Sequence, residues 1–169
     1  MKYFFYFVMD IHPLVTHFPI VLLVIGVVCD AIGILRHRDF FVRVGFLLFS
    51  LGALTAIPVA LTGDSAAEVA QHIDGIAADL EVHDTLGTVT AFLAVALALV
   101  RTHFVLKKKF VGFVRYVYLV FGLVTAGLVC AAGYTGGYLV YFYGAGTEPV
   151  TSQIELEKRV PRVDKFESR

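Results

Sequence analysis

The fold is decided by residues 11–35, which read IHPLVTHFPIVLLVIGVVCDAIGIL. Behind its two histidines the run is long and apolar enough for a membrane-spanning helix, which needs about 20 apolar residues. Ionisable side chains at the edge of the hydrocarbon layer are costly, and they usually face the interior of a bundle or a wet cavity. His12 and His17 therefore mark both the start of a first span and a candidate functional site.

The rest of the chain has the same apolar character. Of the 169 residues, 58% are hydrophobic and 17% are charged, and the mean hydropathy is +0.79, against about 45–50% apolar and about 25% charged in soluble domains. We predict an all-α fold, an integral membrane four-helix bundle with spans at about 13–35, 40–62, 84–106 and 114–143. The bundle forms one domain, residues 1–146, followed by a charged tail, residues 147–169.

Two short segments need separate interpretation. The aromatic run at residues 3–9 is too short for a cleavable signal and lacks a small-residue cleavage site, so we expect it to lie at the membrane interface. The tail carries five acidic and five basic residues. A tail of this kind either stays mobile or lies along a neighbouring subunit.

The basic residues predict the orientation. They fall between spans one and two and between spans three and four, at Arg36, Arg38, Arg43, Arg101, Lys107, Lys108, Lys109 and Arg115, whereas residues 63–81 contain none. By the positive-inside rule, both termini and the 63–81 loop lie on the outer, periplasmic side. We therefore expect a multi-pass protein of the inner membrane of a prokaryote.

Two histidines are placed to ligate one metal. His17 lies in the first turn of span one and His83 in the first turn of span three. These spans run in the same direction, so both imidazoles reach similar depths below the outer surface, as the axial ligands of one haem iron must. His12 and His72 form a possible second metal or haem site, although a histidine in a polar loop is more often simply solvated.

The other histidines and the cysteines are expected to be structural. His37 and His103 each follow one of the predicted ligands by 20 residues, which is about 30 Å of helix, so both should lie at the opposite interface. Cys29 and Cys130 are read as ordinary buried small residues. Because the sequence has no C-x-x-C-H motif, any haem would be held non-covalently.

Small residues follow one face of spans two to four, including Gly133 and Gly137 in span four. They either serve helix packing alone or leave room for a flat macrocycle opposite a histidine. Haem propionates usually pair with Arg or Lys, which are scarce near the outer end, so tyrosines of span four could donate hydrogen bonds instead: Tyr134, Tyr138 and Tyr141.

The outer loop is acidic. Its run at residues 66–71 reads as a short amphipathic surface helix, and Asp84 is expected to neighbour the site without ligating. An acidic surface would steer a basic partner toward the mouth of the site, or it simply reflects which residues the topology leaves outside. The acidic residues are Asp64, Glu68, Asp74, Asp79, Glu81 and Asp84.

Over residues 11–145 the sequence resembles the small four-helix membrane family known as domain of unknown function 2231. The resemblance rests on His12-Pro13, on His17-Phe18-Pro19-Ile20, on Thr62-Gly63, on His83 and on the segment Gly136-Gly137-Tyr138-Leu139-Val140-Tyr141. It implies a b-type-cytochrome-like protein that does redox work at the outer membrane face, with His17, His83 and His12 as the matching histidines.

The expected function is electron transfer by haem b, bound through His17 and His83, between periplasmic c-type cytochromes or quinol and a larger complex. Bis-histidine ligation leaves no open coordination site, so the protein is expected to be non-catalytic. No nucleic acid is expected as a partner. Two alternatives stay open: a histidine-based copper, zinc or iron protein, and a purely structural membrane anchor.

Overall fold

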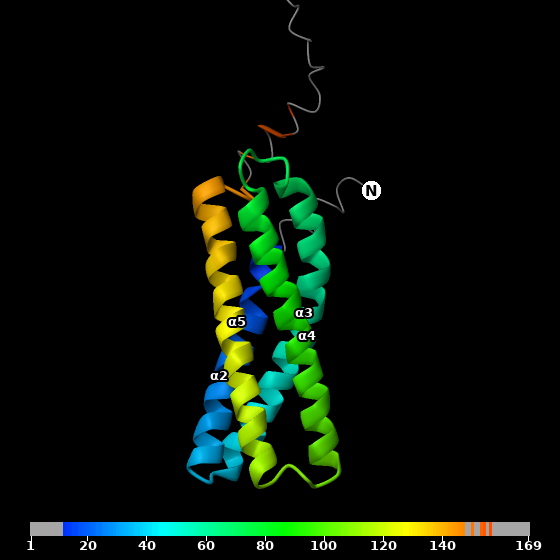
Figure 1. The fold of residues 1–169 in the computed structure, drawn as a ribbon, viewed down its shortest axis with the longest axis vertical. Coiled ribbons are helices and arrows are strands. Elements are labelled where there is room, and N and C mark those ends of the chain that lie inside the picture. The colour runs from blue at the N-terminus through cyan, green and yellow to red at the C-terminus, as the bar shows by residue number, and fades with distance from the viewer. Residues whose placement is uncertain (1–11, 148–149, 151–152, 155, 157–169) are drawn as a thin grey trace, which may run out of the picture.

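The structure, a computed structural model, describes residues 12–147, 150, 153–154 and 156. This part of the chain contains four long helices and no strand, which confirms the all-α prediction (Figure 1). All four are long and apolar enough to cross a membrane. The run at residues 3–9 lies outside the described residues. The helices are α2 (His17–Leu35), α3 (Asp39–Ala70), α4 (Ala77–Leu106) and α5 (Phe113–Tyr143).

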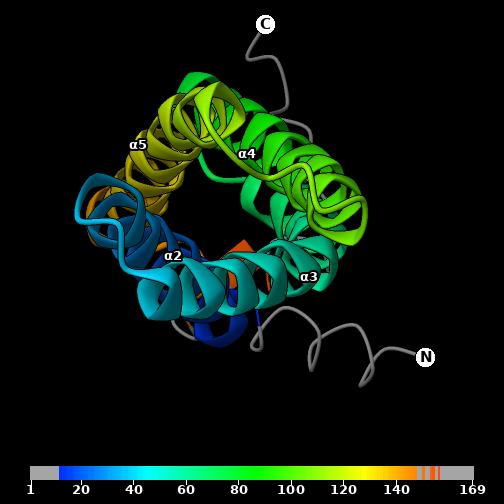
Figure 2. The same cartoon turned by 90° about the horizontal axis from the view of Figure 1, so that it is seen from below.

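The helices form a ring in chain order. Extensive contacts join α2 to α3, α3 to α4, α4 to α5 and α5 back to α2, and the view along the bundle shows the same order (Figure 2). Because consecutive helices run antiparallel, α2 and α4 are parallel to each other and stand diagonally across the bundle. The first turns of spans one and three therefore lie at the same end.

Two helices are longer than the sequence predicts. Helix α3 continues through residues 63–70, so the expected separate helix at 66–71 is instead the last part of α3. Helix α4 begins at Ala77 rather than near residue 84. Hydropathy marks only the apolar part of a helix. Helix α3 continues through Asp64 and Glu68 because the same turns also place small apolar residues toward the interior of the bundle.

Close packing of α2 against α3 depends on glycine. A Cβ atom on Gly26 would lie 2.8 Å from the backbone nitrogen of Phe49, and one on Gly52 would lie 2.9 Å from Cγ of Leu23. A Cβ atom on Gly45 would lie closer still to the Asp30 carboxylate. Small residues let helix backbones approach in lipid, and the predicted stripe on span two is buried in the structure.

The bundle consists of two helical hairpins, α2–α3 and α4–α5, whose helix ends correspond. Helices α2 and α4 end at residues 71 positions apart, Leu35 and Leu106. The next turns both use a left-handed residue, His37 (φ 53°) and Lys108 (φ 55°), again 71 positions apart. Helices α3 and α5 end at residues 70 and 143, 73 positions apart. The parallel arrangement relates the hairpins by an approximate two-fold axis along the bundle.

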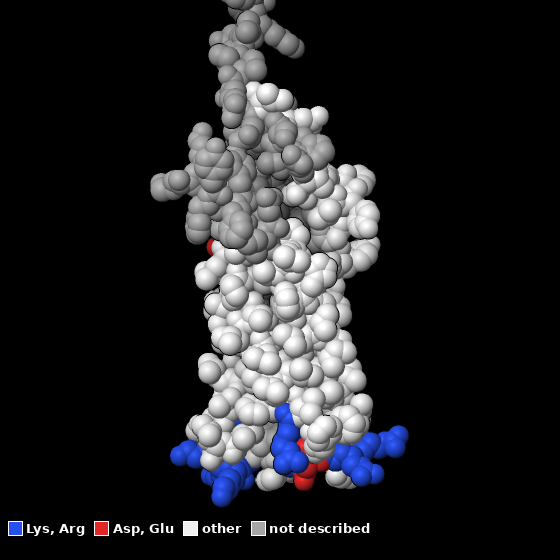
Figure 3. Space-filling model, turned by 180° about the vertical axis from the view of Figure 1, so that it is seen from behind, with Lys and Arg blue, Asp and Glu red and all other residues white. Residues whose placement is uncertain are grey.

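Lys and Arg gather at one end, here called the basic end, where the α2–α3 and α4–α5 turns lie (Figure 3). The opposite end, here called the histidine end, has no Lys or Arg among the described residues. Three assignments to the connections were wrong: Arg43 belongs to α3, Arg115 to α5 and Arg101 to α4, where Arg101 is 1% exposed. A buried cation is tolerated there because a carboxylate faces it.

Candidate functional site

The four helices enclose a cavity of about 340 Å³ toward the histidine end, near the lower limit of small-molecule sites. His12, His17 and His83 all line it. We call it the histidine cavity. The rest of its wall is mostly small or apolar and includes Leu23, Ala60, Ala67, Gly87, Ala91, Gly133, Gly136 and Gly137.

His83 lies in the second turn of α4, rather than in the first turn as predicted, because the helix begins at Ala77. Helix α5 holds the His83 ring. Its Nδ1 lies 3.1 Å from the carbonyl oxygen of Ala132 and 3.0 Å from Oγ1 of Thr135. The Thr135 hydroxyl donates its own proton to the same carbonyl, so both neighbours act as acceptors. Nδ1 of His83 therefore carries the proton and donates it.

His12, in the helical turn before α2, is held by α3 in the same manner. Its Nδ1 lies 3.0 Å from Oγ1 of Thr62. The single proton of the Thr62 hydroxyl has acceptors in its own helix, the carbonyl oxygens of Pro58 and Val59, which favours the hydroxyl oxygen as the acceptor from the imidazole. His12 thus has the same tautomer as His83, with the proton on Nδ1.

His17 is more exposed and is held by its own helix. Its Nδ1 donates to the carbonyl oxygen of Pro13 at 2.8 Å. The Thr16 hydroxyl donates to the same carbonyl oxygen at 2.8 Å. His17 therefore also presents a protonated Nδ1.

The arrangement leaves three basic nitrogens at one cavity. With Nδ1–H fixed in each ring, Nε2 carries the lone pair, and it has no hydrogen-bond partner among the described residues for His12, His17 or His83. Metal-ligating histidines almost always donate the opposite ring N–H to a carbonyl or similar acceptor, which fixes the ring and raises its basicity. The donor chemistry fits a metal or a metallated macrocycle.

The other predicted site residues lie in different places. Gly133 and Gly137 line the cavity, as does Asp84. His72 is exposed, does not line the cavity, and has its Nδ1 3.3 Å from the carbonyl oxygen of Val69. The structure therefore does not bring His12 and His72 together at the cavity. Among the described residues, no three His, Cys, Asp or Glu side chains are grouped to hold a metal ion.

The tyrosines proposed to meet propionates do not line the cavity. Tyr134 and Tyr141 are 77% and 94% exposed, and Tyr138 stacks on Phe142. The cavity closes instead with residues after α5: Val150 and Ile154 both line it, and Ile154 is buried. At these two positions the chain beyond residue 146 packs on its own bundle.

The remaining histidines and cysteines stand apart from the cavity. His37 and His103 are exposed near the basic end, where the sequence places them. Both cysteines are free; Cys29 is half-buried and Cys130 is exposed, so Cys130 is not the buried residue expected from its apolar span. None of the four lines the histidine cavity.

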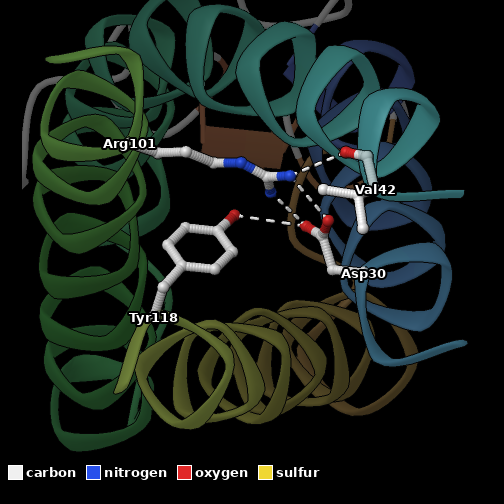
Figure 4. A network of polar contacts seen from close by, with 4 residues as sticks. All are labelled: Asp30, Val42, Arg101 and Tyr118. Atoms are coloured by element: carbon white, nitrogen blue, oxygen red, sulfur yellow. Dashed lines mark hydrogen bonds and ion pairs between the residues drawn. The ribbon is translucent and has the colours of Figure 1, made fainter. Parts of the chain in front are cut away.

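Sequence reasoning missed a second polar cluster, in the half of the bundle near the basic end (Figure 4). The Arg101 guanidinium makes a two-pronged ion pair with the Asp30 carboxylate and also donates to the carbonyl oxygen of Val42 at 2.7 Å. Tyr118 lies 3.4 Å from the same carboxylate. The signal was present in the sequence, because a lone Asp within an apolar span requires a partner.

Aromatic rings surround this cluster. The Arg101 guanidinium carbon lies 5.1 Å from the ring centroid of Phe46, 4.8 Å from that of Phe110 and 4.5 Å from that of Tyr118. Both charged side chains are at most 1% exposed. Cation–π contacts strengthen when they are desolvated, so the cluster is a closed structural core that links α2 with α4.

No curated protein and no solved structure matches this sequence significantly. A family match covers most of the chain, from residue 9 to residue 149, and includes all four helices and the histidine cavity. The chain is thus a multi-pass integral membrane protein and belongs to the family described as "Predicted membrane protein (DUF2231)".

Proposed function

We propose that this protein is a membrane electron-transfer subunit that binds haem b non-covalently in the histidine cavity. His83 of the second hairpin would be one of the two residues that hold the iron. The other comes from the start of the first hairpin, where His17, the residue predicted from the sequence, and His12 both line the cavity. The main support is the state of these imidazoles: each directs its Nδ1–H to an acceptor, which leaves the lone pair on Nε2. The spans that carry them are parallel and stand diagonally across the bundle.

The cavity wall suits a flat apolar macrocycle. On α4 and α5 the wall contains Gly87, Ala91, Gly133 and Gly137, and Cβ atoms added at Gly87 or Gly137 would meet nothing within 4 Å. Such a wall leaves space beside the imidazoles without requiring helix movement. An iron porphyrin with two histidine ligands supplies reversible one-electron transfer without an open site for oxygen.

The protein would tune that chemistry through burial and hydrogen bonds. Acceptors on Nδ1 of each ring, Thr62 for His12 and Ala132 with Thr135 for His83, increase the electron donation of Nε2. The apolar lining limits access of water, which also affects the reduction potential. These residues are therefore the ones that set how readily an electron is accepted.

The proposed location is the inner membrane of a prokaryote, with the histidine end on the periplasmic side. Support comes from the seven exposed or partly exposed basic residues at the opposite end and from the absence of Lys and Arg among the described residues of the histidine end. The acidic residues near the cavity mouth suit basic electron-transfer partners such as c-type cytochromes. Quinol is a second candidate for the electron-transfer partner.

The test is a reduced-minus-oxidised absorption spectrum of the purified protein. We expect a Soret band and resolved α and β bands at one haem per chain, lost in His83→Ala and kept in His103→Ala. His103 is the matched control because it lies on the same helix, at the basic end, and is exposed. Colourless wild-type protein overturns the proposal; stoichiometric copper, zinc or iron in it would favour the metal-binding alternative, and no metal would favour the anchor.

A further inference from the structure

The equivalence of the two hairpins extends to the histidine cavity. His12 precedes His83 by 71 positions, the same offset that separates the ends of α2 and α4. The two histidines therefore occupy matching places at the starts of spans one and three. His17 has no such counterpart, because the position 71 residues later is Thr88.

The surroundings of His12 and His83 match as well. Each imidazole donates from Nδ1 to a threonine hydroxyl at 3.0 Å, Thr62 in one hairpin and Thr135 in the other. The two threonines are 73 positions apart, the offset that relates α3 to α5. Each hydroxyl also donates to the carbonyl oxygen three residues earlier in its helix.

A glycine follows each threonine and leaves room for the ring. A Cβ atom on Gly63 would lie 3.3 Å from Cε1 of His12, and one on Gly136 would lie 2.9 Å from Cε1 of His83. Each hairpin therefore contains the same unit, a histidine at the start of its first helix that rests on a Thr-Gly pair of its second helix. The approximate two-fold axis places these units on opposite sides of the cavity.

The two rings also resemble each other in burial and lie near one another. Both are half-buried, whereas His17 is exposed, and His12 and His83 are within range of mutual electrostatic interaction. His17 is held only by the carbonyl oxygen of Pro13 in its own span. A ring anchored across two helices has its direction fixed more firmly than one anchored within a single exposed turn.

We infer that His12 and His83, rather than His17 and His83, are the pair of imidazoles that ligates the metal centre in the histidine cavity. This assignment rests on the proposed function. A metallated macrocycle has two equivalent faces, and a pseudo-symmetric pair would offer it two Nε2 atoms with the same tautomer and the same kind of support. His17 then lines the cavity without ligating.

The experiment compares His12→Ala, His17→Ala and His83→Ala, purified from membranes, by absorption and electron paramagnetic resonance spectroscopy. We expect wild type and His17→Ala to show a six-coordinate low-spin iron. In His12→Ala and His83→Ala, we expect a five-coordinate high-spin iron or at least a tenfold loss of haem. Added imidazole, which replaces a missing ligand, should restore the low-spin spectrum in any His12→Ala protein that retains haem.

The result that overturns the inference is loss of the low-spin spectrum in His17→Ala together with its retention in His12→Ala; haem binding, and with it the proposed function, would then still stand. Absence of haem from wild type would instead overturn both. Thermal unfolding of each variant shows whether the substitution has disturbed the fold. Imidazole rescue is a second control, because a misfolded His12→Ala protein would not regain the low-spin spectrum. A second variant, Thr62→Val, keeps the ring and should shift the reduction potential if His12 ligates.

Discussion

Asp30 of α2 and Arg101 of α4 occupy equivalent positions of the two hairpins, 71 residues apart, and form a buried ion pair across the bundle. The two-fold relation that brings matching histidines together at one end thus brings complementary charges together near the other. Both side chains are at most 1% exposed, so each charge depends on the other for compensation. The pair fixes how the two hairpins meet.

Removing one partner of this pair should destabilise the bundle strongly. We expect Arg101→Met to lower the free energy of unfolding by about 3–5 kcal/mol, because it leaves the Asp30 carboxylate buried without its cation. Denaturant unfolding in detergent, followed by circular dichroism, measures the change. The double variant Asp30→Leu with Arg101→Met should recover most of the loss, and failure to recover would mean that the pair itself contributes net stability.

An exposed ion pair provides the control for that measurement. Asp39 is 81% exposed and lies 3.9 Å from a guanidinium nitrogen of Arg115 near the basic end. Exposed pairs contribute about 0–1 kcal/mol, so Asp39→Asn should change stability by no more than that. A comparable loss in Asp39→Asn and in Arg101→Met would contradict the special role given to the buried pair.

The close approach of α2 and α3 gives a second prediction. We expect Gly26→Ala to destabilise the protein by about 1–3 kcal/mol, the usual cost of overpacking, because the new Cβ would meet the backbone of Phe49 at 2.8 Å. Gly127→Ala is the matched control, since its Cβ would meet nothing within 4 Å. Equal thermal unfolding temperatures for the two variants would show that the helices can separate without cost.

Much of the fold was predictable from the sequence because membrane spans depend on a one-dimensional property. Four apolar runs gave the number of helices and the fold class, and the position of His83 at the head of a span gave a cavity residue. Helix ends were less predictable, because α3 and α4 continue beyond the apolar segment with half-polar turns.

The buried pair and the repeat were not predicted, for related reasons. Arg101 lies only five residues before the end of α4, so by sequence it is grouped with the basic turn that follows. Asp30, at the matching position of the other hairpin, has the opposite charge. Aligning the two hairpins by residue identity therefore does not reveal that Asp30 and Arg101 correspond. Only the three-dimensional arrangement shows that the two positions face each other.

The threonines behind the imidazoles should differ in importance. Nδ1 of His83 has a second acceptor at 3.1 Å, the carbonyl oxygen of Ala132, whereas the corresponding carbonyl of Val59 interacts more weakly with His12, whose main acceptor is the Thr62 hydroxyl at 3.0 Å. Thr62→Val should therefore lower haem retention by about 10–100-fold, the usual effect of losing such a partner. Thr135→Val should have a smaller effect, and titration of apoprotein with haem measures both. The reverse order would show that Thr62 does not orient a ligand.

The orientation can be tested by cysteine labelling. In a background with Cys29 and Cys130 replaced by alanine, we introduce Asp74→Cys in the turn between α3 and α4, or Lys109→Cys in the turn between α4 and α5; both positions are exposed. A membrane-impermeant maleimide should label Asp74→Cys in intact spheroplasts and Lys109→Cys only after permeabilisation, because the basic turns are expected in the cytoplasm. The opposite pattern would place the histidine cavity at the cytoplasmic face, where c-type cytochromes of the periplasm could not reach it.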